Sequence, residues 1–431
     1  MYLDEIVKLQ QRGEPRGIPS ICSAHPTVLR AAMQNITGPL LIEATCNQVN
    51  QFGGYTGRTP VDFVRFVKEI AQENKFPFEN IILGGDHLGP SVWQDESADS
   101  GMKKADRLIR DYVEAGFTKV HLDCSMRLAD DPEGFLNVET SAKRAARLAK
   151  VAETWGNENL RYVIGTEVPL PGGATEHEEG VNVTNVTDLQ RTIECAHEEF
   201  IHEGLEEAWE RIIAVVVQPG VEYGDDFVLP YVPDRAQELS KFIKKYSMVY
   251  EAHSTDYQTR EALKSLVQDK FAILKVGPAL TFAFREAVYG LAMIENEIIK
   301  KGDRSNIILT LDQAMIQRPE YWIKYYHGSD EEIAFKRKYS LSDRIRYYWP
   351  DASVQQAYNQ MLTTLNQFPI PTELIKEYLP DISKELFDRG ELITPEQIML
   401  LKVIRVLDDY NQACNLTRTG SIIANTKLNC D

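Results

Sequence analysis

Short apolar runs alternate with longer amphipathic stretches from about residue 19 to 300. Eight times an apolar run ends in polar or charged side chains, and a segment with helical spacing follows. The runs lie at 19–25, 40–46, 81–87, 119–125, 162–168, 212–218, 248–254 and 271–277. Eight strand–helix units in series are what a parallel (β/α)8 barrel needs. The pattern therefore predicts an α/β fold of the TIM-barrel type.

The amphipathic stretches predict the outer helices of this barrel. They lie at 62–74, 98–115, 139–155, 186–204, 234–246, 257–268 and 280–300. In the second of them Leu108, Ile109, Tyr112 and Val113 share one helical face, and Gly116 supplies a stop signal. We expect these apolar stripes to pack on the strands, with the 280–300 helix closing the cycle.

The remaining chain predicts an addition to the barrel. We assign residues 1–300 to the barrel domain, 301–414 to a helical C-terminal extension and 415–431 to a disordered polar tail. Two long strand-to-helix loops, 47–60 and 169–185, are candidate substrate lids. The glycines at 53–57 lack the spacing of a nucleotide-binding loop. Aromatic-rich segments in the extension either pack it on the barrel or bring Arg344 or Arg346 over the rim to a phosphate.

Charge and composition narrow the choice of partners. The formal net charge is −17 and the pI about 5.1, which argues against nucleic acid and anionic membranes as partners. No apolar run approaches the ~18 residues of a membrane span, and the N-terminus lacks signal-peptide features. The six cysteines show no CxxC spacing, which is typical of reduced packing cysteines. We expect a cytoplasmic protein.

Side chains able to do chemistry gather at the strand ends, which form the active-site mouth of a barrel. Residues two apart share a face of a strand, so Glu251 pairs with His253, His121 with Asp123, and Glu43 with Thr45. The third, fifth and sixth strands end in Asp86 and His87, Glu167, and Gln218.

Imidazoles and carboxylates together favour a divalent metal, with Zn expected and Mn, Ni or Co as alternatives. His87 and His253 are the predicted ligands, and Glu167 and Gln218 are candidates for the remaining positions. His121 lies in mid-strand, which indicates a buried supporting role. The alternative is that these histidines are purely structural.

Asp86 beside His87 is a candidate acid/base next to a metal ligand. Asp86 could instead orient an imidazole. Asp123 and Glu251 are further acid/base candidates, and one crowded acid could keep its proton.

Small residues after the seventh and eighth strands indicate phosphate binding through backbone N–H groups. The alternative is a tight turn with a helix cap. The candidate substrate contacts are Glu43, Asn47, Gln48, Ser254, Thr255, Asp256, Gly277 and Arg344.

Longer motifs carry a family resemblance. They lie at 42–57, 84–90, 121–123, 164–169, 216–220, 250–257, 274–279 and 339–350. From about residue 17 to 410 the chain resembles the D-tagatose-1,6-bisphosphate aldolase Z-subunit family, whose members are often called non-catalytic. The family is similar to class II metal-dependent ketose-bisphosphate aldolases. The resemblance implies that Asp86 is a proton donor and that His87 and His253 are metal ligands. Gln218 stands where those aldolases have another metal histidine.

Two functions follow from the resemblance and the polar rim. Some members of the family are described as ketose-phosphate 4-epimerases, so one hypothesis is metal-dependent C4 chemistry on tagatose and fructose phosphates by retro-aldol cleavage and re-addition. The alternative is a non-catalytic stabilising subunit with a catalytic aldolase subunit as its partner. Other members carry the name tagatose-6-phosphate kinase, but no phosphate loop supports kinase chemistry here. We expect a sugar-phosphate substrate and an oligomer.

Overall fold

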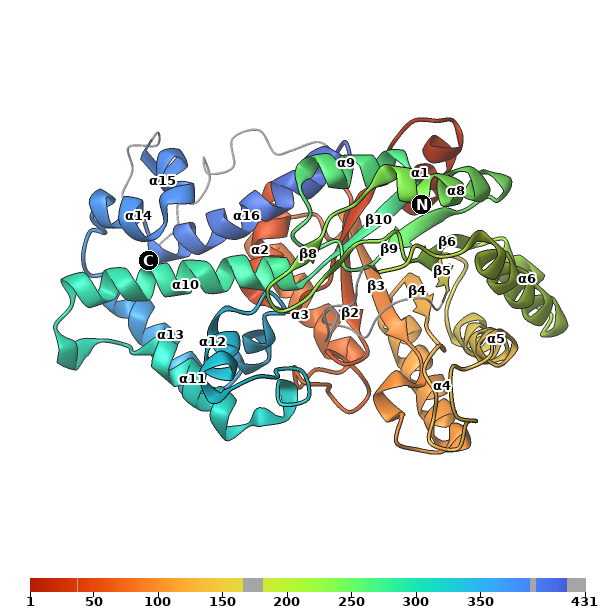
Figure 1. Ribbon diagram of the computed structural model, residues 1–431, viewed down its shortest axis with the longest axis horizontal. Coiled ribbons are helices and arrows are strands. Elements are labelled where there is room, and N and C mark those ends of the chain that lie inside the picture. Colours follow the sequence, from red (N-terminus) through yellow and green to blue (C-terminus); the bar gives the residue numbers. More distant parts are fainter. Residues whose placement is uncertain (37, 166–180, 388–392, 417–431) are drawn as a thin grey trace.

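A closed barrel of eight parallel strands forms the centre of the computed structural model, which describes residues 1–36, 38–165, 181–387 and 393–416 (Figure 1). Around the barrel the strand order is β1-β10-β9-β6-β5-β4-β3-β2. The strands are β1 Ile18–Ile21, β2 Leu40–Thr45, β3 Ile81–Leu88, β4 Lys119–Leu122, β5 Arg161–Ile164, β6 Ile212–Val217, β9 Val249–Ala252 and β10 Phe271–Val276. The predicted TIM-barrel fold is confirmed. A short antiparallel pair, β7 Glu222–Tyr223 and β8 Val228–Leu229, lies in the loop after β6.

The outer ring contains the helices predicted between residues 62 and 268. They are α3 Pro60–Glu73, α4 Ala98–Ala115, α5 Val138–Trp155, α6 Val186–His202, α8 Pro233–Phe242 and α9 Arg260–Gln268. Two further helices, α2 Pro26–Asn35 and α7 Glu206–Trp209, were not among the predicted ones. In α4 the predicted apolar face is buried, and Gly116 ends the helix with a φ of 102°. That left-handed conformation is one that glycine adopts without steric strain.

The ring is completed by a helix from the far end of the chain. We predicted that the helix at 280–300 would close it, and α10 Pro278–Ile298 does form there. However, α16 Pro395–Ala413 packs against α2, α9 and β1, the neighbours of the closing position. The long α10 instead packs along α16 and into the extension (Figure 1), which buries side chains around most of its circumference.

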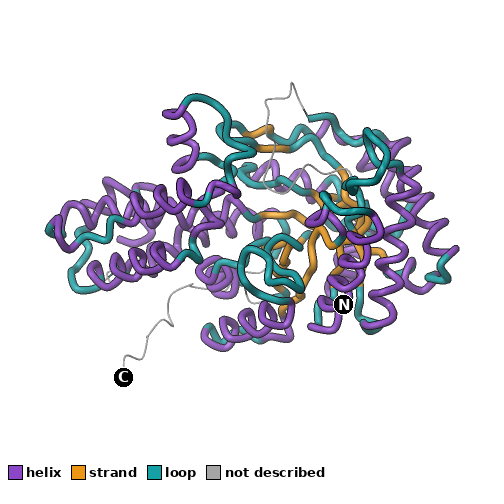
Figure 2. The backbone as a smooth tube through the Cα atoms, turned by 90° about the horizontal axis from the view of Figure 1, so that it is seen from below, coloured by secondary structure: helices purple, strands orange, loops and turns teal. Residues whose placement is uncertain are grey.

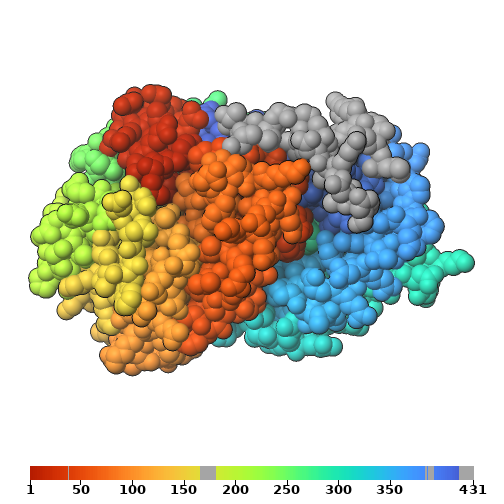
Figure 3. All heavy atoms as spheres, turned by 180° about the vertical axis from the view of Figure 1, so that it is seen from behind, coloured from red at the N-terminus to blue at the C-terminus, as the bar shows by residue number. Residues whose placement is uncertain are grey.

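In the described residues from 301 to 387 the extension contains helices and no strand, and Figure 2 shows helices grouped to one side of the barrel strands. They are α11 Ile307–Gln317, α12 Asp330–Tyr339, α13 Ala352–Leu365, α14 Thr372–Tyr378 and α15 Pro380–Phe387. Short 3-10 turns lie at Phe78–Asn80, Pro90–Trp93, Ile243–Lys245, Lys301–Asp303, Pro319–Tyr321 and Arg344–Tyr348. In Figure 3 the extension, in cyan and blue, forms one side of the molecule and the yellow and green barrel units form the other.

The interior of the barrel is apolar at the end opposite the mouth. The N-terminal helix α1 Tyr2–Gln11 inserts Leu3 and Ile6 among inward-facing side chains such as Leu41, Val163 and Val249. This plug closes the lower end of the barrel. Polar side chains in the interior are therefore reached from the opposite end.

Among the described residues, none of the helices is both long and apolar enough to span a membrane. The five described cysteines are all free thiols, and Cys46, Cys124 and Cys414 are buried.

Candidate active site

A layer of buried charges lies above the apolar plug. Lys119 Nζ is 2.5 Å from Glu43 Oε1 and 2.6 Å from Glu251 Oε2, and all three side chains are fully buried. Lys275 Nζ is 2.5 Å from Glu43 Oε2. Gly84 makes room for this layer, because a Cβ there would lie 2.6 Å from the Glu43 carboxylate. The two lysines are thus held between strands β2, β4, β9 and β10.

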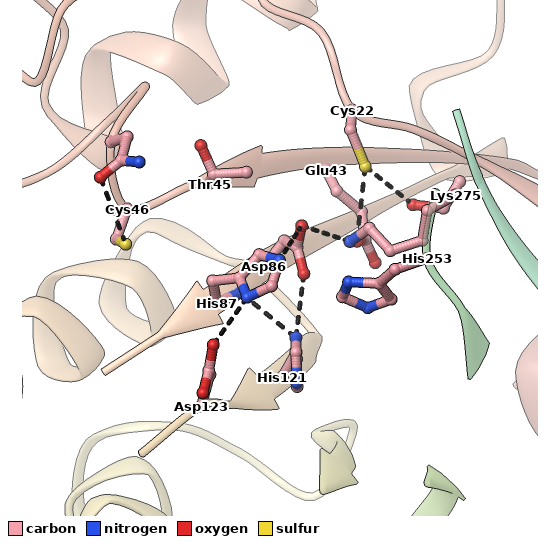
Figure 4. A network of polar contacts seen from close by, with 12 residues as sticks. Cys22, Glu43, Thr45, Cys46, Asp86, His87, His121, Asp123, His253 and Lys275 are labelled. Atoms are coloured by element: carbon pink, nitrogen blue, oxygen red, sulfur yellow. Dashed lines mark hydrogen bonds and ion pairs between the residues drawn. The ribbon is translucent and has the colours of Figure 1, made fainter. Parts of the chain in front are cut away.

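Asp86, His87, His121 and His253 lie at the mouth, directly next to that layer (Figure 4). The three imidazole rings have centroids 4.8 to 5.3 Å apart. Asp86 forms an ion pair with Lys275, and its Oδ1 lies 2.9 Å from His121 Nδ1. His253 Nε2 lies 3.1 Å from Glu251 Oε1. Strands β3, β4 and β9 therefore bring acids and imidazoles to one point, next to Lys275 of β10.

His87 is held in an unusual backbone conformation. Its φ is 48°, in the left-handed region, and its Nδ1 lies 2.7 Å from Asp123 Oδ2. Carboxylates commonly orient metal-binding histidines through the ring nitrogen that does not bind the metal. Asp123 thus fixes the ring orientation of His87. The sequence had indicated an acid/base role for Asp123.

Burial and neighbouring charges together set the protonation states of the side chains in this cluster. Burial lowers the pKa of His253 to about 3, which leaves this imidazole neutral. Burial alone would raise the pKa of Asp86, but His87 and Lys275 outweigh it and hold that pKa well below its usual range. Burial opposes charge on Lys275, yet Asp86 and the other nearby acids raise its pKa. Asp86 is therefore an ionised carboxylate beside an ammonium group.

Four of these side chains could share a metal ion. One ligand atom from each of Asp86, His121, Glu251 and His253 lies within 4.8 Å of all the others. His121 Nε2 is buried and has no hydrogen-bond partner among the described residues. A neutral imidazole and a buried, unpartnered ring nitrogen suit a borderline metal such as Zn²⁺. The donor set fits a divalent metal, and it includes His121, to which the sequence had assigned only support.

The other predicted ligands are placed differently. Glu167 lies outside the described residues. Gln218 Oε1 accepts hydrogen bonds from the backbone N–H groups of Gly220 and Val221, at 2.8 and 3.1 Å. The structure thus uses the Gln218 side chain to shape the turn after β6 and does not bring it into the cluster.

A small cavity of about 90 Å³ opens above the cluster. Among its lining residues are Asp86, His87, His253 and Lys275, together with the predicted substrate contacts Asn47, Gln48, Ser254, Asp256 and Gly277. Glu43 and Glu251 lie below the cavity, in the layer of charges. Thr255 is fully buried and bonds to the Lys275 carbonyl and to Tyr410.

The predicted phosphate loop is already occupied by a carboxylate. Asp256 Oδ1 accepts hydrogen bonds from Gly277 N and Ala279 N, at 3.0 and 2.8 Å. These backbone N–H groups at the start of α10 are the ones that a phosphate would use. Ser254 has a φ of 52° next to this turn. The arrangement is the helix cap that we had considered as the alternative.

Of the two arginines in the 339–350 motif, Arg346 lines the cavity and Arg344 does not. The guanidinium of Arg344 is buried 3.1 Å from the ring centre of Tyr325 and donates to the Tyr321 carbonyl.

The sequence analysis did not identify Lys119 and Lys275 as site residues. The period of two would have placed Lys119 on the inward face of β4 together with His121.

Fold and site together define a (β/α)8-barrel protein with a buried carboxylate–imidazole–ammonium cluster at its C-terminal mouth. Comparisons with known proteins give the family. The profile of the family described as D-tagatose-1,6-bisphosphate aldolase subunit GatZ/KbaZ-like matches residues 3–415. The chain belongs to this family.

Individual relatives agree with this assignment. The D-tagatose-1,6-bisphosphate aldolase subunits GatZ of Salmonella heidelberg SL476 and Salmonella typhimurium LT2 are each 49% identical over 420 residues, covering 96% of this chain and 99% of theirs. A crystal structure from Sinorhizobium meliloti 1021, described as a probable tagatose 6 phosphate kinase, is 45% identical with a TM-score of 0.86. It covers 93% of this chain and 100% of its own.

Proposed function

We propose that this chain is a metal-dependent enzyme that inverts C4 of tagatose and fructose phosphates by retro-aldol cleavage and re-addition. The observation that carries the proposal is the convergence of Asp86, His121, Glu251 and His253 below a cavity at the barrel mouth. A non-catalytic stabilising subunit has no need for this cluster. Burying charged groups costs free energy, and well-packed apolar side chains in the same place would be at least as stable.

The reaction conserves protons and electrons. A carboxylate removes the proton from O4, the C3–C4 bond breaks, and the electron pair stays on the C1–C3 fragment as an enediolate. The C4–C6 aldehyde turns its other face, the C3–C4 bond forms again, and the proton returns to O4. Fructose 6-phosphate becomes tagatose 6-phosphate without any redox cofactor.

Asp86 is our candidate for the proton transfer at O4. It lines the cavity, it is ionised, and His87 and Lys275 lie close enough to hold its charge. Lys275 also lines the cavity, so its ammonium can offset negative charge that develops on the sugar. Asp123 acts through His87, by fixing the imidazole ring.

A divalent metal would be held by His121, His253 and Glu251, with His87 as the further candidate that the sequence predicted. When bound, the metal would polarise the C2 carbonyl as a Lewis acid. The buried, unpartnered Nε2 of His121 supports this assignment.

The test uses the full chain alone, treated with a chelator and then supplied with Zn²⁺, Mn²⁺, Ni²⁺ or Co²⁺. Carbon-13 NMR follows fructose 6-phosphate and tagatose 1,6-bisphosphate. We expect metal-dependent tagatose 6-phosphate, lost in Asp86→Asn. His197→Asn, on the outer helix α6, is the matched control and should stay active. If no metal restores turnover on either sugar, the catalytic proposal fails.

The second candidate is a stabilising subunit of a heteromeric tagatose-bisphosphate aldolase, with the catalytic subunit as partner. The names of the relatives support it. The extension also exposes apolar side chains on and between α11 and α12, at Leu309, Ile316, Ile323 and Phe335, each more than half exposed. Such exposure can mark a protein interface. An inactive chain that binds and stabilises a catalytic aldolase subunit, and loses this with Ile316→Lys and Phe335→Lys, would establish the second candidate.

A further inference from the structure

A second and larger cavity adjoins the small one. It has a volume of about 460 Å³ and lies between the loops after β1 and β2, the start of α10 and the 346–358 segment of the extension. Five residues line both cavities: Cys22, Gln48, Tyr55, Gly277 and Arg346. A ligand can therefore extend from the reacting site into the larger cavity, which we call the arginine chamber.

Positive charge dominates the arginine chamber. Arg30, Arg58 and Arg346 line it, and none of its described lining residues is an acid. Arg58 and Arg346 form no ion pair with a carboxylate among the described residues, whereas Arg30 contacts the exposed Glu73 at 3.1 Å. The guanidinium of Arg346 instead donates to the carbonyls of Ser342 and Asp343. These bonds hold the guanidinium in place without a direct ion pair, although the more distant carboxylates of Asp256 and Asp343 interact with its charge.

Two further features of the chamber suit an anion. Trp349 is only 3% exposed, and its Nε1, which can only donate, has no hydrogen-bond partner in the described structure. The N-terminus of α2 also meets the chamber, since His25, Pro26 and Thr27 line it and no side chain caps the helix. Unsatisfied N–H groups there carry partial positive charge.

We propose that the arginine chamber binds the terminal phosphate of an open-chain sugar phosphate, the one farthest from the reacting carbonyl. The contrast with the loop after β10 carries the inference, because Asp256 already takes the N–H groups of Gly277 and Ala279. The described lining of the chamber has three guanidinium groups and an unpartnered indole N–H, and it includes no carboxylate. Guanidinium groups match phosphate oxygens in charge and geometry.

The identity of the sugar rests on the proposed function, but anion binding does not. The first experiment therefore needs neither metal nor turnover. Inorganic phosphate, fructose 6-phosphate and unphosphorylated fructose are titrated into the full chain by calorimetry. We expect the two phosphates to bind and to compete with each other, with fructose at least tenfold weaker than fructose 6-phosphate.

Variants assign the binding to the chamber. Arg58→Gln and Arg346→Gln should each raise the dissociation constant of both phosphates at least tenfold, while Arg107→Gln, on the exposed face of α4, should not. Arg346 also supports its own loop, so Arg58→Gln keeps the test valid if Arg346→Gln does not fold. Trp349→Phe should weaken phosphate binding about fivefold.

The result that would overturn the proposal is phosphate binding that is absent, or unchanged in both arginine variants with intact circular dichroism. Phosphate binding that follows these variants in a chain without epimerase activity would leave the chamber assigned and refute only the proposed function.

Discussion

Replacing Lys119 by methionine tests whether the charges inside the barrel are real. The substitution keeps an unbranched side chain up to the position of Cε and removes the ammonium, which contacts Glu43 and Glu251 at 2.5 and 2.6 Å with no exposure to solvent. At an effective dielectric constant of about 20, each contact is worth about 6 kcal/mol of attraction. Desolvation of the ions offsets much of this gain.

The net loss of unfolding free energy depends on the buried carboxylates that the substitution leaves without their ammonium partner. Two buried carboxylates would then share Lys275, which also pairs with Asp86. Removing one partner of a buried ion pair costs about 3–5 kcal/mol, against a typical total stability of about 5–15 kcal/mol. We expect Lys119→Met to lose about 3–5 kcal/mol of unfolding free energy.

The free energy of unfolding is measured in urea. The transition is monitored by both tryptophan fluorescence and circular dichroism, because coincident transitions justify a two-state free energy. Adding Glu43→Gln removes one stranded carboxylate and should recover at least half of the loss. Lys103→Met, which breaks an exposed pair with Asp99, should leave the urea midpoint unchanged. A loss below about 1 kcal/mol for Lys119→Met, or no recovery in the double variant, would refute the ionised network.

Three further predictions concern the mouth and its supports. Burial raises the pKa of Asp256 from 3.8 to about 6, outweighing its bonds to backbone N–H groups, so the folded chain keeps a proton that the unfolded chain releases between about pH 4 and 6. The stability that this proton contributes is present below pH 4 and lost as pH rises through 6. The unfolding free energy of Asp256→Asn relative to the natural chain should therefore rise by up to about 3 kcal/mol between about pH 4 and 6. A difference in urea unfolding that does not change with pH would contradict this prediction. Tyr410→Phe removes buried bonds from the hydroxyl to Thr255 and should cost about 1–3 kcal/mol in the same assay; a neutral result would mean that this hydroxyl does not tie α16 to the barrel. Asp123→Asn should weaken metal binding about 10–100-fold, because His87 loses the partner that orients its ring; calorimetry with Zn²⁺ showing unchanged affinity would exclude this role.

The sequence predicted the strands well because each is a local pattern. The apolar runs and their polar ends placed all eight barrel strands and the outer helices α3 to α6 nearly at their observed bounds. The same alternation identified Asp86, His87, Glu251 and His253 as residues of the mouth, and the structure brings these four together.

The candidate site was less predictable where a side chain had a choice of partners. The Gln218 amide could face the barrel or its own loop, and the structure turns it to the loop. His121 lies on an inward face in mid-strand. Only closure of the barrel, which puts Asp86 on the neighbouring β3 and His253 across the interior, reveals an unpartnered ring nitrogen near both. The orientations of the Gln218 amide and the His121 imidazole depend on neighbours that are distant in the sequence, so the local pattern does not predict them.

By itself, the sequence determined the order of the eight strand–helix units and the alternation of side chains along each strand, because backbone geometry imposes periods of two and 3.6 on any chain. Tertiary structure alone decided that α16 rather than α10 lies between α9 and α2, that Arg346 rather than Arg344 faces the cavities, and that Asp256 closes the loop expected to bind phosphate. These outcomes depend on which distant segments compete for one position, and free energies of packing and charge pairing settle that competition only when all the segments are in place.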